Sequence, residues 1–145
     1  MQHENITVFC DGTPNYNPQR TPRPKPKRRG SFSASESSPL KYDDGLDRVY
    51  TDWLPKSILE ISNANQNDRF HPTQKPVALL EYLVRTYTNE GDTVLDFTAG
   101  SGTLGVACVN TNRNAVLIEK ELEYFEIAQR RISEAQAQTV MELAI

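Results

Sequence analysis

The stretch "VLDFTAGSGTLGVAC", from Val94 to Cys108, decides the fold of this chain. Its apolar start predicts a buried strand, and glycines then allow a tight turn into a helix that we expect from about Thr103 to Asn110. Asp96 ends the strand, four positions before Gly100. The stretch therefore predicts a strand–turn–helix junction that holds a phosphate or a nucleoside, or that simply turns the chain.

Helices and strands alternate on both sides of this junction. In "PVALLEYLVRTYT", which starts at Pro76, apolar residues recur at spacings of three and four and predict a helix with one buried face. After the junction, "AVLIE" predicts a second buried strand, and a helix is expected from Glu121 to about Gln138. Apolar strands that alternate with helices predict an α/β fold with a parallel sheet flanked by helices.

The first half of the chain contributes little to that sheet. We expect a strand at Asn5–Cys10, a short strand at Ser57–Ile61, and between them a long irregular, flexible segment rich in proline, serine and charge. The sheet therefore looks incomplete. The predicted division is an N-terminal strand and turn (1–16), a flexible basic segment (17–48), an α/β domain (49–138) and a C-terminal tail (139–145).

Charge is distributed unevenly along the chain. The formal net charge is −3, yet six cations and no acid lie between Arg20 and Arg29. Such a local basic run favours a polyanionic partner, although a solvated loop explains it equally well. The two cysteines, Cys10 and Cys108, form no metal or disulfide pattern. No signal peptide or membrane-spanning run is visible, so we expect a cytoplasmic protein without a membrane partner.

The residues around the junction discriminate between ligand classes. Glu119 follows the second strand, 23 positions after Asp96, where a carboxylate can accept hydrogen bonds from ribose hydroxyls. The segment from Gly100 matches the dinucleotide pattern Gly-x-Gly-x-x-Gly, which is a weak signal alone. A carboxylate at Asp96 repels a pyrophosphate and attracts a cation, which favours an adenosyl cofactor such as S-adenosylmethionine. A turn without a ligand remains open at this point.

Two motifs together resemble a known family. "HPTQKPVALLEYLVR", from His71 to Arg85, followed by "GDTVLDFTAGSGT", resembles the β-class DNA amino-methyltransferases, which make N6-methyladenine or N4-methylcytosine. The resemblance runs from His71 to about Ile132, and "HENITVFCDGTPNYNP" near the start also looks like a family strand and loop. It implies a partial Rossmann-like class I methyltransferase sheet and S-adenosyl-L-methionine as the cofactor.

The resemblance also assigns roles by position. Glu119 would hold the ribose, Asp96 and the glycine loop would line the methionine end, and the segment before the first helix would close over the cofactor. The full cofactor set is Thr73, Gln74, Lys75, Asp96, Phe97, Thr98, Ala99, Gly100, Ser101, Gly102, Thr103 and Glu119. The sequence departs from the usual family motif at Phe97-Thr98-Ala99, and this departure affects loop packing more than ligand polarity.

One family motif is missing. Methyl transfer to an exocyclic amine uses an Asp/Asn-Pro-Pro-aromatic loop that holds the flipped base, but no Pro-Pro pair occurs in this sequence. Asn17-Pro18 lacks the second proline and the aromatic residue. We therefore assign no catalytic residue. The chain resembles the C-terminal, cofactor-binding part of such an enzyme, and catalysis would need a second polypeptide that carries the motif.

The basic run falls where the family's variable region faces DNA, so DNA is the expected partner. The candidate DNA-binding residues are Arg20, Arg23, Lys25, Lys27, Arg28 and Arg29. The favoured function is an S-adenosylmethionine-dependent, adenine-N6 DNA methyltransferase that is active with its partner chain. Four alternatives remain open: self-association in place of a partner, a non-catalytic regulatory module that binds DNA or the cofactor, a decayed gene fragment, and a dinucleotide-binding oxidoreductase.

Overall fold

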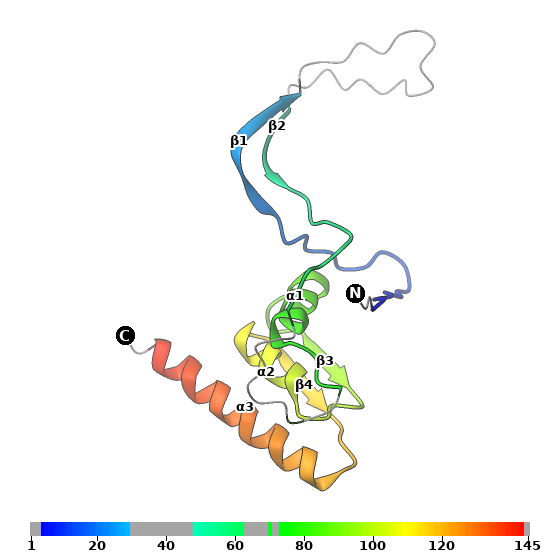
Figure 1. Ribbon diagram of the computed structural model, residues 1–145, viewed down its shortest axis with the longest axis vertical. Coiled ribbons are helices and arrows are strands. Elements are labelled where there is room, and N and C mark those ends of the chain that lie inside the picture. The colour runs from blue at the N-terminus through cyan, green and yellow to red at the C-terminus, as the bar shows by residue number, and fades with distance from the viewer. Residues whose placement is uncertain (1–3, 30–47, 63–69, 71–72, 144–145) are drawn as a thin grey trace. The chain divides into compact units, whose positions relative to one another are not determined.

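The computed structural model describes residues 4–29, 48–62, 70 and 73–143 (Figure 1). Contacts within the chain divide it into two units, one made of Met1–Asn17 and Leu59–Ile145 and the other of Pro18–Ile58. We call them the junction unit and the hairpin unit. The four-part domain division drawn from the sequence stays a prediction.

The junction unit contains helices α1 (Val77–Tyr87), α2 (Thr103–Asn110) and α3 (Leu122–Leu143) and strands β3 (Thr93–Asp96) and β4 (Asn114–Leu117). The two strands pair in parallel, with α2 between them in the sequence as the crossover helix (Figure 1). The predicted order of helix, strand, helix, strand, helix is confirmed, and so is the α/β fold class with parallel strands flanked by helices.

Helix α3 is longer than expected. It continues to Leu143, so residues 139–143, predicted as part of a C-terminal tail, belong to the helix instead. The sequence there, "TVMEL", lacks both Gly and Pro, and no residue in it interrupts a helix. Val140 and Met141 are 68% exposed, so this last part of the helix forms without burying its apolar side chains.

Small side chains build the core of the junction unit. Helix α2 contacts α1, α3 and β4, and its Ala107 and Cys108 are 0% and 1% exposed. On α3, Ala128 and Ala135 are also buried. Alanines at these positions let the helices approach closely, so α2 is held between its neighbours and its first turn has a fixed position.

Cys108, on α2, is a buried thiol. Burial raises the pKa of the Cys108 thiol, and the nearby Arg113 guanidinium opposes this rise. The other cysteine, Cys10, is exposed. The two thiols therefore differ sharply in how readily reagents in solution reach them.

One face of the two-stranded parallel sheet is apolar and exposed. Leu95 and Val116 are paired neighbours across the sheet and are 59% and 49% exposed. Ile118, two residues beyond Val116, is 54% exposed. Side chains two residues apart point to the same side of a strand, so these three residues form one continuous surface. We call it the bare sheet face, and it agrees with the expectation that the sheet is incomplete.

The hairpin unit corrects part of the expectation of a flexible, irregular segment, because residues 21–29 and 48 lie in strands. Strand β1 (Thr21–Arg29) pairs antiparallel with β2 (Arg48–Trp53), with an irregularity in register between Pro22 and Lys27. Pro24 and Pro26 lie between Pro22 and Lys27, where the register shifts and residues of β1 have no paired partner on β2, so neither proline has to donate a hydrogen bond within the ladder.

Two strands predicted from the sequence are wrong. Residues 5–10 and 57–61 have no regular structure, and the sheets of the described residues contain β1 with β2 and β3 with β4. Val8 and Phe9 are 46% and 88% exposed, so the β-branched and aromatic run has no surface to pack against. Within the described ranges, no helix combines the length and the apolar character that a membrane crossing requires.

Candidate functional site

The carboxyl ends of β3 and β4 bring the two predicted carboxylates to one edge of the sheet. Asp96 is paired with Leu117 at the end of the ladder. Beyond it, the Ile118 N–H donates to the Asp96 carbonyl at 2.8 Å, and the Ala99 N–H donates to the Ile118 carbonyl at 3.0 Å. The two chains thus stay together past the strands, and Glu119 follows directly beside the glycine loop.

Glu119 is held by backbone amides from two segments. Its Oε2 accepts a hydrogen bond from the Gly100 N–H at 2.7 Å, and its Oε1 accepts from the N–H groups of Lys120 and Glu121 at 2.9 and 3.0 Å. Hydrogen bonds from backbone amides to a carboxylate are among the stronger ones in proteins. Glu119 therefore joins the loop after β3 to the loop after β4, which the sequence did not predict.

Asp96 organises the turn that precedes the glycines. Its Oδ1 accepts from the Thr98 N–H at 2.9 Å and from the Thr98 hydroxyl at 3.3 Å. Phe97, between them, is 73% exposed. Asp96 itself is half-buried and lies next to the loop.

The two glycines of the junction both need a backbone that other residues avoid. Gly100 has φ 54° and Gly102 has φ 73°. A Cβ on Gly102 would lie 2.6 Å from the Cβ of Ala128, so its missing side chain makes room for α3. Gly102 is also the residue that caps α2, and it does so without a side chain. Thr103 is the first residue of the helix.

The segment before α1 reaches the junction through one side chain. Gln74 is 8% exposed, and its Oε1 accepts a hydrogen bond from the Ser101 hydroxyl at 2.9 Å. Lys75 is exposed and forms an ion pair with Glu4 at 2.6 Å. Thr73 is exposed. His71 and Pro72, which begin the motif, lie outside the described residues.

Arg131 is a residue of the site that sequence reasoning missed. It lies on α3, three residues after the buried Ala128 and four before the buried Ala135, and its guanidinium donates to the Ser101 carbonyl at 2.6 Å. The sequence could have indicated Arg131, because an arginine on the buried face of an amphipathic helix needs a nearby hydrogen-bond acceptor.

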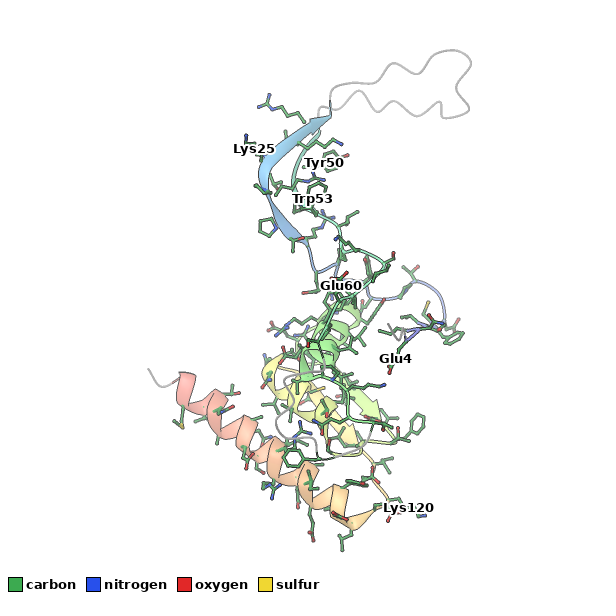
Figure 2. The ribbon with its side chains drawn as sticks, viewed as in Figure 1. Glu4, Lys25, Tyr50, Trp53, Glu60 and Lys120 are labelled. Carbon is green, nitrogen blue, oxygen red and sulfur yellow. The ribbon has the colours of Figure 1, made fainter. Side chains whose placement is uncertain are left out.

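The predicted DNA-binding residues lie on or beside β1 of the hairpin unit, and one of them, Lys25, is labelled in Figure 2. Arg20 forms an ion pair with Asp52 at 2.7 Å, and Arg23 stacks 3.4 Å over the ring of Trp53 while its Nε donates to the Asp52 carbonyl at 2.7 Å. These two arginines hold β1 against β2. The side chains of Lys25, Lys27 and Arg28 are exposed, whereas that of Arg29 lies outside the described residues.

Several curated relatives match part of the chain. The type II methyltransferase M.HpaI of Haemophilus parainfluenzae is 43% identical over 81 residues, which is 54% of this chain and 26% of that protein. The DNA adenine methyltransferase YhdJ of Escherichia coli (strain K12) is 42% identical over 74 residues, 51% of this chain and 25% of that protein. The matched part spans about a quarter of the length of these relatives.

Among solved structures, the complex of M1.HpyAVI with SAM is 34% identical over 63% of this chain and 52% of that one, with a TM-score of 0.42. At the level of families, residues 1–130 match the family described as DNA methylase. That match includes the carboxyl ends of β3 and β4 and the whole glycine junction. The chain therefore belongs to the DNA methylase family of N6- and N4-methyltransferases.

Proposed function

We propose that this chain binds S-adenosyl-L-methionine at the glycine junction and supplies the methyl-donor site of a DNA amino-methyltransferase. One observation carries the proposal. Two carboxylates, Asp96 and Glu119, leave adjacent parallel strands at the same edge, on either side of a loop with two glycines at positive φ. Ligands of open α/β sheets bind at this edge.

The chemistry of these residues fits that cofactor. S-adenosylmethionine carries a sulfonium and an ammonium group, and it supplies a methyl group when bound. Both charges are complementary to Asp96 and Glu119, while a dinucleotide would bring its pyrophosphate against them. Glu119, oriented by the Gly100 amide, is suited to accept hydrogen bonds from ribose hydroxyls. The roles of the other predicted residues, such as Thr73 and Phe97, are part of the same proposal.

Catalysis requires a further polypeptide segment with the Asp/Asn-Pro-Pro-aromatic motif, which this sequence does not contain. The bare sheet face of Leu95, Val116 and Ile118 supports this part of the proposal. Parallel sheets are normally covered on both faces, so an exposed apolar face favours a covering partner. We assign it to the polypeptide that brings the motif, and self-association is the competing arrangement.

DNA is the proposed substrate, contacted through the hairpin unit. Exposed lysines and arginines on a two-stranded ribbon neutralise phosphates, and a ribbon of this kind fits the major groove. Adenine is the proposed target, because a relative with 42% identity is a DNA adenine methyltransferase. DNA as the substrate also makes the cytoplasm the expected location.

A non-catalytic regulatory module is the second candidate. It is favoured by the absence of the catalytic motif from the sequence, and it shares the cofactor site and the basic hairpin with the first. The two differ in what a partner adds. A split enzyme transfers methyl groups to DNA once a polypeptide with the motif is supplied, and a regulatory module only changes the rate of an enzyme that is already active.

Isothermal titration calorimetry with S-adenosylmethionine tests the cofactor site directly. We expect saturable binding to the full 145-residue chain, no binding of NAD, and weaker binding by an Asp96→Asn variant, which keeps the size of the side chain and removes its charge. An Asp92→Asn variant is the matched control, because Asp92 precedes β3 at its opposite end. Binding of NAD in place of S-adenosylmethionine would overturn the proposal.

A methyl-transfer assay on duplex DNA tests the enzyme. The chain alone is expected to be inactive, and addition of a family polypeptide that carries the motif is expected to restore transfer from labelled S-adenosylmethionine. The matched control is a Leu95→Glu variant, which places a charge on the bare sheet face and should prevent the restoration. Transfer by the isolated chain would show that the missing motif is not essential.

A further inference from the structure

Arg131 connects α3 to the glycine junction through three hydrogen bonds. Its Nη1 lies 2.6 Å from the Ser101 carbonyl oxygen, 3.0 Å from the Ser101 hydroxyl and 3.2 Å from the Thr103 hydroxyl. Ser101 and Thr103 are 2% and 6% exposed, so the contacts are shielded from water. The guanidinium is thus a fixed donor next to the backbone that turns from β3 into α2.

The connection extends to the segment before α1. The Ser101 hydroxyl, which accepts from Arg131, donates in turn to Gln74 Oε1 at 2.9 Å. Gln74 Oε1 also accepts a hydrogen bond from the Phe70 N–H at 3.2 Å. The Arg131 guanidinium also lies 5.4 Å from the centroid of the Phe70 ring. One arginine therefore joins three separate parts of the sequence at the junction.

The position of Ser101 explains what these bonds do. It lies between Gly100 and Gly102, whose backbones are at φ 54° and 73°. Glycine populates many conformations with similar ease, so a Gly-Ser-Gly loop has little preference for one shape. Bonds from a cation to the carbonyl and hydroxyl of the middle residue are about twice as strong as neutral ones and select a single shape.

We propose that Arg131 is a positioning residue of the methyl-donor site, which fixes the Gly100–Gly102 backbone in its binding conformation from the side of α3. The inference rests on the proposed function, since it names a residue that regulates the affinity of the same site. Arg131 acts through Ser101 and does not itself bind the methyl donor. A loop that is already in its bound shape loses less freedom on binding, so the affinity is higher.

The test compares three variants of the full chain. Arg131→Met removes the hydrogen bonds and keeps the aliphatic stem, and Arg131→Lys keeps the charge with fewer donors. Arg130→Met is the matched control, because it removes the same charge from the same helix, and a guanidinium 5.8 Å from the Phe70 ring centroid, while it leaves the hydrogen bonds of Arg131 in place. Calorimetry measures affinity for S-adenosylmethionine, and amide hydrogen exchange measures opening at Gly100, whose N–H is bonded to Glu119.

We expect Arg131→Met to weaken S-adenosylmethionine binding on the order of tenfold or more, as for loss of hydrogen bonds to a charged group. Exchange at the Gly100 amide should accelerate by a similar factor while exchange in the β3–β4 ladder stays unchanged. Arg131→Lys should lie between Arg131→Met and the wild type, and Arg130→Met should match the wild type.

The two measurements separate failure of this inference from failure of the proposed function. If the wild-type chain does not bind S-adenosylmethionine, the proposed function fails, and exchange at Gly100 still decides whether Arg131 fixes the loop. If Arg131→Met binds within twofold of the wild type, or accelerates exchange equally in the ladder, Arg131 has only a general structural role and the inference is overturned. Should Arg131→Met not fold, the same comparisons with Arg131→Lys decide.

Discussion

Replacing Gly102 with alanine should destabilise the junction unit more than the same change at Gly91 or Gly105. Gly102 has φ 73°, and a Cβ built there would lie 2.6 Å from the Ala128 Cβ and 2.9 Å from its Cα. Both contacting atoms are fixed by the α3 backbone, so no side-chain rotation relieves the clash. The substitution therefore combines an unfavourable backbone conformation with overpacking of two elements.

The structure gives the size of each contribution. A left-handed backbone costs a residue with a Cβ about 1–2 kcal/mol. Overpacking by a methyl group in a filled core costs about 1–3 kcal/mol. The sum, roughly 2–5 kcal/mol, is a large part of the 5–15 kcal/mol that is typical for the unfolding of a whole domain. We expect Gly102→Ala to be the variant closest to unfolding at room temperature.

Two other glycines separate the contributions. Gly91 has φ 83° with nothing within 4 Å of a built Cβ, so Gly91→Ala should show the backbone cost alone, about 1–2 kcal/mol. Gly105 is inside α2, and its Cβ would meet the ends of the Ile132 and Leu117 side chains at 2.5 and 2.7 Å. Those ends can rotate, and alanine favours a helix by about 1 kcal/mol over glycine, so Gly105→Ala should cost less than Gly102→Ala.

Urea denaturation followed by far-ultraviolet circular dichroism measures the free energy of unfolding of each variant. The difference between Gly102→Ala and Gly91→Ala isolates the contact with Ala128, and we expect it to be about 1–3 kcal/mol. If Gly102→Ala costs no more than Gly91→Ala, α3 does not press against the junction as described. The argument that couples α3 to the glycine loop would then fail.

Four further results are expected. Glu119→Gln should weaken S-adenosylmethionine binding by about tenfold, measured by calorimetry, since the loop loses a charged acceptor; unchanged affinity would exclude Glu119 from the site. Replacing Lys25 and Lys27 with glutamine should lower the slope of log K against log salt for DNA binding by about 2, and an unchanged slope would remove them from the interface. In iodoacetamide labelling read by mass spectrometry, Cys10 should react quickly and Cys108 slowly. Folding raises the pKa of the Cys108 thiol, so the contribution of this thiol to stability is present below the ordinary thiol pKa and is lost as pH rises through the raised value. The free energy of unfolding, measured by urea denaturation, should therefore be higher at pH 8 than at pH 10.

Elements with a strong local pattern could be predicted from the sequence. Helix α2 was expected from Thr103 to Asn110 and has those bounds, because glycine at the start and a polar turn at the end define it. The strand "TVLD" and helix α1 likewise follow from apolar runs and spacing. Asp96 and Glu119 were placed at the same sheet edge by the order of elements alone, and the parallel pairing agrees.

The errors have a shared physical cause, which is pairing between distant segments. Residues 5–10 have strand propensity and no partner strand, whereas the proline-rich residues of β1 lack propensity and pair with β2. Strand formation depends on a partner more than on composition. Arg131 was missed for a similar reason, since its acceptor at Ser101 is 30 residues away in the sequence.

The hairpin unit leaves and rejoins the junction unit between Asn17 and Leu59. At the point of departure, the Asn17 N–H donates to the Thr86 carbonyl at 2.7 Å and its side-chain amide donates to the Thr88 carbonyl at 3.0 Å. The chain is thus clamped just before the excursion begins. Such an insertion can be exchanged by recombination or lengthened while the clamp stays intact, so the hairpin unit can change in evolution without a change in the junction unit.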